Sequence, residues 1–115
     1  MRFAVWARAS VLCLMTMGTA SIASDQTGKV TMVSVNNYGD PYGFIVTGSR
    51  TTKPACAATD EVWVITNSTG PNAQAMYSTI LTAFTMKIPV QVVGTSTCDP
   101  SAPTREKVSY INVQQ

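Results

Sequence analysis

The sequence predicts a small, mainly β domain that contains a single helix. Short segments rich in β-branched and aromatic residues recur along the chain, and polar segments with glycine and proline separate them. Only one segment, centred near Met76, repeats apolar residues at the spacing of a helix. The chain of 115 residues shows no internal repeat and no low-complexity run, so we expect one folded domain.

The N-terminal segment has the three parts of a secretory signal peptide. Arg2 and Arg8 provide positive charge, and the run from Ala9 to Met17 is apolar. Ser21-Ile22-Ala23 then places small residues at the positions that a signal peptidase recognises. The apolar run is far shorter than the roughly 20 residues that a membrane-spanning helix needs.

We therefore expect residues 1–23 to be a signal peptide and residues 24–115 to be the mature domain. Cys13 lies within the signal and should be removed with it. The mature protein is expected to be secreted or periplasmic, without a membrane span.

Three strands are expected before the helix. Residues 28–36 and 61–66 are rich in β-branched residues, and residues 42–47 have an apolar centre. Turn residues at 36–41 predict that the first two strands form a hairpin. The polar segment 48–59 contains proline and cysteine and predicts a loop.

The predicted helix begins near Pro71, since proline suits the first turn of a helix, and it ends at Lys87-Ile88-Pro89. Its apolar residues recur at spacings of three and four, which predicts one buried face. This face consists of Ala73, Met76, Tyr77, Ile80 and Phe84. We expect Phe84, at the end of the face, to be buried against the strands.

Two strands are expected after the helix. Residues 90–93 alternate valine with glutamine and predict a fourth strand that Gly94 terminates. Residues 95–104 hold two prolines and predict a loop, and residues 107–113 predict a fifth strand. Three strands, a helix and two strands follow one another as in the OB-fold, a five-stranded β-barrel. An α+β sheet with one packed helix has the same order of elements and remains an alternative.

Composition limits the chemistry available to the protein. The net charge of +2 disappears once Arg2 and Arg8 are removed, because six basic and six acidic residues then remain. A nearly neutral domain lacks the electrostatic basis for nucleic-acid binding. The chain has no histidine, and its carboxylates are scattered except for Asp60 and Glu61, which would point to opposite faces of a strand and are interpreted as solvated charges. We expect no catalytic, metal or cofactor site.

Cys56 and Cys98 are the two cysteines of the expected mature domain. In an oxidising compartment, such a pair in a small domain most often forms a disulfide. In the chain-entropy model the bond stabilises the fold by roughly 4 kcal/mol. The alternative, a reactive thiol, has no histidine to activate it.

Four segments carry a resemblance to a known family: Thr27 to Val33, Pro41 to Ile45, Met76 to Leu81 and Lys87 to Val92. They resemble the B subunits of bacterial toxins of the subtilase-cytotoxin and pertussis-like type, sparsely but over most of the mature chain. The resemblance implies an exported OB-fold protomer that closes into a pentamer and binds cell-surface glycans, often sialylated. A catalytic A chain is a further candidate partner, although the sequence does not tell whether one exists.

The resemblance suggests where a glycan would bind. In that family a serine before the glycine that opens the first strand contacts the sugar, and Thr27 before Gly28 stands at the matching place with its hydroxyl. The family's tyrosine after the fourth strand falls on Gly94, so one ring is missing here. Candidate glycan-binding residues are Thr27, with Asp25 and Tyr38 nearby.

Two functions therefore remain open. The first is a glycan-binding, ring-forming B-type subunit, in which the polar helix flank Gln74, Ser78 and Thr82 would face a central pore. The second is a periplasmic or secreted accessory or inhibitor-type protein on the same fold, which should present an exposed apolar patch.

Overall fold

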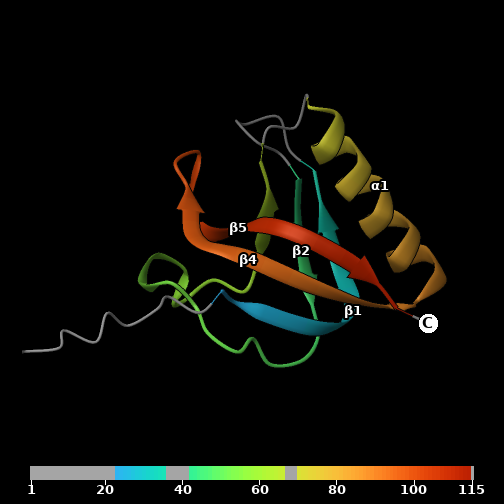
Figure 1. Ribbon diagram of the computed structural model, residues 1–115, viewed down its shortest axis with the longest axis horizontal. Helices are drawn as coiled ribbons and strands as arrows, with labels where there is room; N and C mark the ends of the chain where they lie inside the picture. Colours follow the sequence, from blue (N-terminus) through green and yellow to red (C-terminus); the bar gives the residue numbers. More distant parts are fainter. Residues whose placement is uncertain (1–22, 36–41, 67–69, 115) are drawn as a thin grey trace, which may run out of the picture.

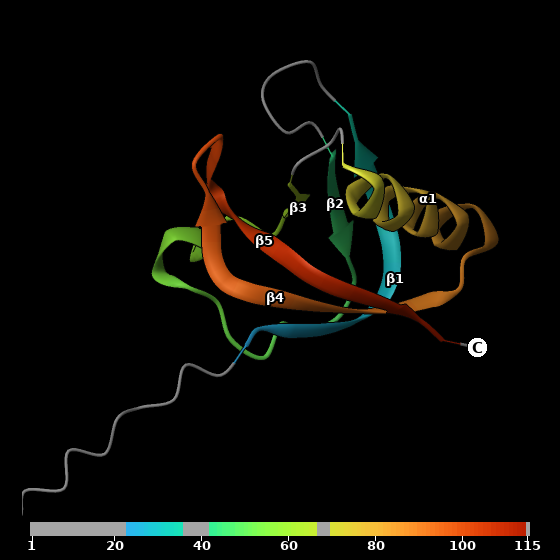
Figure 2. The same ribbon diagram turned by 45° about the horizontal axis from the view of Figure 1, so that its top comes forward.

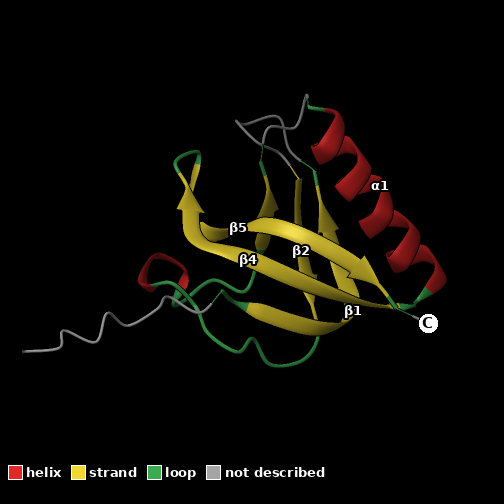
Figure 3. Ribbon diagram, viewed as in Figure 1, coloured by secondary structure: helices red, strands yellow, loops and turns green. Residues whose placement is uncertain are grey.

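The computed structural model describes residues 23–35, 42–66 and 70–114. Within them the chain forms five strands, one α-helix and one short 3-10 helix (Figures 1 and 3). In chain order these are β1 (Asp25–Ser34), β2 (Tyr42–Val46), η1 (Ala55–Ala57), β3 (Trp63–Ile65), α1 (Pro71–Met86), β4 (Pro89–Asp99) and β5 (Ala102–Val113). The predicted order of three strands, a helix and two strands is confirmed.

The strands close into a barrel in the order β1-β2-β3-β5-β4. Strands β3 and β5 pair in parallel, and the other neighbours pair antiparallel, including the predicted β1–β2 pair. Strands β4 and β5 lie side by side as a long, strongly bent ribbon (Figures 1 and 2). This closed order, with the helix between β3 and β4, is the OB-fold that the sequence predicts, and it excludes the open-sheet alternative.

Apolar side chains fill the barrel. The largest fully buried ones are Trp63, Phe44, Ile65 and Ile80, of which the first three come from β2 and β3 and the last from α1. Strand β4 alternates as a barrel strand should, with Val90 and Val92 inside and Gln91 only partly buried between them.

Helix α1 lies against β1, β3 and β5 through the predicted face except for Phe84, since Met76 and Tyr77 are partly buried against the core. Ala73, Ile80 and Ala83 are buried, whereas Phe84 is 42% exposed, so the prediction of a buried Phe84 is wrong. The small side chain of Ala83 sits where the helix approaches the barrel, and Phe84 is turned away from it by about 100°. The phenyl ring therefore lies on a flank of the helix. The predicted polar flank, Gln74, Ser78 and Thr82, is exposed.

The β4–β5 hairpin is longer than predicted. A strand ending at Gly94 and a loop over 95–104 were expected, but β4 continues to Asp99 and β5 begins at Ala102. The pairing register shifts after Gly94, and Ser96 adopts a φ of 62° in this irregular segment. The remaining boundaries differ from the predicted ones by only a few residues.

Gly94 stays within the strand because two buried side chains occupy the place of its missing one. A Cβ atom at Gly94 would lie 2.0 Å from Oε2 of Glu106 and 2.7 Å from Cζ3 of Trp63. The glycine therefore marks a close approach inside the barrel and does not end the strand.

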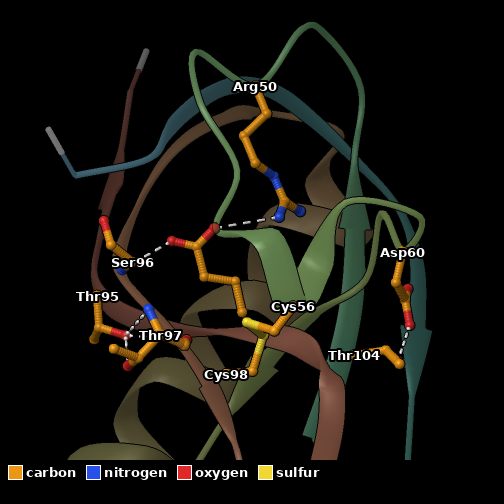
Figure 4. The surroundings of a disulfide bond; sticks show 9 residues. Arg50, Cys56, Asp60, Thr95, Ser96, Thr97, Cys98 and Thr104 are labelled. Carbon is orange, nitrogen blue, oxygen red and sulfur yellow. Dashed lines mark hydrogen bonds and ion pairs between the residues drawn. A yellow bond between two sulfur atoms is a disulfide. The ribbon is translucent and has the colours of Figure 1, made fainter. Parts of the chain in front are cut away.

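The predicted disulfide is confirmed. Cys56 in η1 is bonded to Cys98 near the end of β4, with a Cα–Cα distance of 6.3 Å (Figure 4). The bond ties the long segment between β2 and β3 to the β4–β5 hairpin. Among the described residues, no helix combines the length and the apolarity that a bilayer span requires. Residues 1–22 of the predicted signal peptide, with Cys13, and the turn at 36–41, with Tyr38, lie outside the described residues.

Removing the disulfide should lower stability. We expect Cys56→Ser/Cys98→Ser to reduce the free energy of unfolding by about 2–5 kcal/mol, because the unfolded chain loses its cross-link. Urea denaturation followed by far-UV circular dichroism measures the change, with the reduced wild-type protein as the matched control. Equal stability of the oxidised and reduced wild-type proteins would contradict a stabilising role for the bond.

Candidate functional site

Strands β1, β4 and β5 present a polar outer face. Thr27 on β1 is the register partner of Gln91 on β4, and Gln91 is in turn the partner of Asn112 on β5. Because partners in a sheet point to the same side, the three side chains form one row across three strands. Their chain neighbours Gln26 and Val92 are buried on the opposite side.

Hydrogen bonds order this row. Nδ2 of Asn112 donates to Oε1 of Gln91 at 3.1 Å, and Nε2 of Gln91 donates to Oδ2 of Asp25 at 3.0 Å. Thr27 is exposed, and its hydroxyl makes no hydrogen bond to another group of the described residues. The face therefore combines amides and a carboxylate of fixed orientation with an unused hydroxyl. We call Asp25, Thr27, Gln91 and Asn112 the polar face.

An aromatic residue lies beside the polar face. Asp25 pairs with Val93, and Val93 pairs with Tyr110, so these three residues form the next row of the same surface. Tyr110 is 50% exposed. A tyrosine there offers an apolar ring and a hydroxyl group to the same ligand.

The chain around Asp25 is held by the segment that follows β2. The backbone N–H of Thr51 donates to the carbonyl of Asp25 at 2.8 Å, and the N–H of Asp25 donates to Oγ1 of Thr51 at 3.0 Å. Farther along β1, Gly28 allows close approach, since a Cβ atom there would lie 2.1 Å from the carbonyl oxygen of Thr47. These contacts with the segment after β2 therefore fix the β1 backbone that carries the polar face.

Arg50, the residue before Thr51, forms a buried ion pair with Glu106. Nη1 of Arg50 is 3.4 Å from Oε1 of Glu106, and both side chains are almost fully buried (1% and 0% exposed). The Arg50 guanidinium carbon lies 3.8 Å from the centre of a Trp63 ring, and Nη2 donates to the carbonyl of Glu61 at 2.9 Å. The N–H of Ser96 donates to the second oxygen of Glu106 (Figure 4).

Burial lowers the pKa of the Arg50 guanidinium from its ordinary value, and the negative charges of Glu106, Glu61 and Asp60 offset part of that effect. Gln26 completes the buried network. Its Nε2 donates to the carbonyls of Val46 and Gly48, and its Oε1 accepts the Trp63 indole hydrogen at 2.7 Å. These charged and polar groups are enclosed, so they serve the fold and offer no surface to a ligand.

The adjacent acids Asp60 and Glu61 have separate partners. Asp60 accepts from the Val62 N–H and from the Thr104 hydroxyl (Figure 4), and Glu61 pairs with Lys53. Burial acts to raise the pKa of Asp60, but these hydrogen bonds and the charge of Arg105 outweigh it, so the pKa is lowered. Asp60 is therefore a structural anion and not a freely solvated one. Across the described residues, no group of three or more His, Cys, Asp or Glu side chains could hold a metal ion.

The structure places two of the three predicted glycan-binding residues together. Asp25 and Thr27 lie on the polar face, and Tyr38 lies outside the described residues. Thr27 is inside β1 and not before its start, because the strand already begins at Asp25. Sequence reasoning missed Gln91 and Asn112. The alternation around Gln91 indicates an outward side chain, but only the strand register reveals its neighbours.

Comparisons with known proteins give no match: no family model, no curated protein and no solved structure matches the chain. Its function is therefore inferred from its own residues and fold.

Proposed function

We propose that the protein is an exported, non-catalytic subunit that binds cell-surface glycans through the polar face of β1, β4 and β5. The observation that carries this proposal is the series of hydrogen bonds that links Asp25, Gln91 and Asn112, with the unused hydroxyl of Thr27 beside it. Sugars present many hydroxyl groups, each of which donates and accepts hydrogen bonds. A surface with a carboxylate, two amides and a hydroxyl meets both requirements.

The mutual hydrogen bonds of the polar face favour binding. Gln91 is held from both sides, by Asp25 and by Asn112, so little side-chain entropy remains to be lost when a ligand binds. The half-exposed ring of Tyr110 adds an apolar contact at the edge of the same surface. A face whose one charged group is the Asp25 carboxylate suits neutral sugar units better than phosphate groups.

The resemblance to toxin B subunits supports a ring of five protomers that accompanies a catalytic A chain. The exposed flank Gln74, Ser78 and Thr82 of α1 would suit a water-filled pore in such a ring. The Cys56–Cys98 bond and the signal-like N-terminus support a secreted or periplasmic location.

A second candidate function is an accessory or inhibitor-type protein on the same fold. The observation that favours it is the exposure of Leu81 and Phe84, which are neighbours on the surface of α1 at a spacing of three. Met86 at the end of the helix is also exposed. Apolar side chains gathered on one helix flank suit contact with another protein.

The Thr27 hydroxyl tests the glycan proposal. Thr27→Val keeps the shape and the β-propensity of the side chain but deletes its hydrogen-bonding group, so we expect glycan affinity to fall by about 1–3 kcal/mol per site. A glycan array identifies the ligand, and calorimetry with that glycan gives the affinity. Thr31→Val, at another exposed position of β1, is the matched control and should bind as the wild type does. Failure of the wild-type protein to bind any glycan would favour the accessory function.

The mass of the assembly tests the ring. Size-exclusion chromatography with light scattering should give five chains for the disulfide-bonded protein if it assembles like toxin B subunits. A strict monomer at micromolar concentration would contradict the ring and would leave any glycan binding as that of a single site.

A further inference from the structure

A groove lies between β1 and the C-terminal end of α1. It has a volume of about 500 Å³, within the range of small-molecule sites. Its lining residues come from β1 and from the last turn of α1, namely Lys29, Val30, Thr31, Phe84, Thr85 and Lys87. The exposed ring of Phe84, which the sequence placed in the core, forms part of this lining.

The groove combines an apolar lining with two positive charges. Phe84 provides most of the exposed apolar surface, beside the largely buried Val30, and Lys29 and Lys87 approach from β1 and from the end of α1. No acidic residue lines the groove. Within the described residues, neither ammonium group takes part in an ion pair. Two like charges beside one groove repel each other, and an anion between them would remove that repulsion.

The described carboxylates of the chain do not supply this anion. Each already has a partner in its own chain: Asp25 has Gln91, Asp60 has Thr104 and Arg105, Glu61 has Lys53, Asp99 has Ser101 and Glu106 has Arg50. A second copy of these residues would have to break such a pair before it could neutralise Lys29 and Lys87. Among the described residues none supplies the anion, so we look for it in another molecule.

We infer that the groove between β1 and the C-terminal end of α1 binds a free fatty-acid anion or an equivalent unbranched carboxylate. The alkyl chain lies against Phe84 and Val30, and the carboxylate lies between the ammonium groups of Lys29 and Lys87. This site shares no residue with the polar face, so the inference holds whether or not the protein binds glycans.

Calorimetry with decanoate below its micelle concentration tests the site on the disulfide-bonded protein. We expect saturable binding, together with shifts of the backbone amide signals of Lys29 to Thr31 and Phe84 to Lys87 in NMR spectra. Acetate, which has the charge alone, and decyltrimethylammonium, which has the opposite charge, should not bind. Equal binding of decyltrimethylammonium would overturn the proposal, and so would binding of phosphatidylglycerol vesicles without binding of decanoate.

Two variants separate the contributions of charge and ring. Lys29→Gln/Lys87→Gln and Phe84→Ala should each weaken decanoate binding by roughly tenfold or more, while both fold as the wild type does because the side chains are exposed. Lys107→Gln removes a lysine of β5 outside the groove and should leave binding unchanged. Wild-type affinity in the double lysine variant would overturn the assignment of the carboxylate position.

Discussion

The ion pair of Arg50 and Glu106 connects strand β5 of the barrel to the long segment between β2 and β3. Taking both charges out of water costs several kcal/mol per ion, and only close pairing with further hydrogen bonds offsets that cost. Here the Trp63 ring lies against the guanidinium, and the Ser96 N–H donates to the carboxylate. Nε of Arg50 is nonetheless buried without a hydrogen-bond partner in the described structure, so the charge of Glu106 is the main compensation for burying the guanidinium.

The position of the polar face follows from this buried pair. Arg50 is adjacent in sequence to Thr51, and Thr51 exchanges two hydrogen bonds with the backbone of Asp25. The Asp25 carboxylate then receives the hydrogen bond from Gln91 that begins the row across β4 and β5. At the other end of the same segment, the bond between Cys56 and Cys98 prevents it from leaving the barrel. A buried charge pair, a loop and a surface site are thus linked through consecutive contacts.

Local patterns were sufficient to predict the order of the elements and the disulfide. Strand alternation and helix spacing are properties of short segments, and the single cysteine pair after the N-terminal segment is a property of composition. Contacts between distant parts of the chain decided the features that the sequence did not predict. Gly94 looked like a strand terminator, but it makes room for Glu106 and Trp63 from other strands. Arg50 lies in a polar segment that gives no sign of burial, and Gln91 acquires its neighbours only through the barrel register.

A double-mutant cycle on the buried pair tests this account most directly. Arg50→Met and Glu106→Gln each leave one polar partner uncompensated inside the barrel, so each should lower the free energy of unfolding by about 3–5 kcal/mol. Arg50→Met/Glu106→Gln should lose less than the sum of the two, with a coupling free energy of at least about 1 kcal/mol. Urea denaturation of the four disulfide-bonded proteins measures all terms. Strictly additive losses, or single losses under about 1 kcal/mol, would show that the pair does not hold the segment to the barrel.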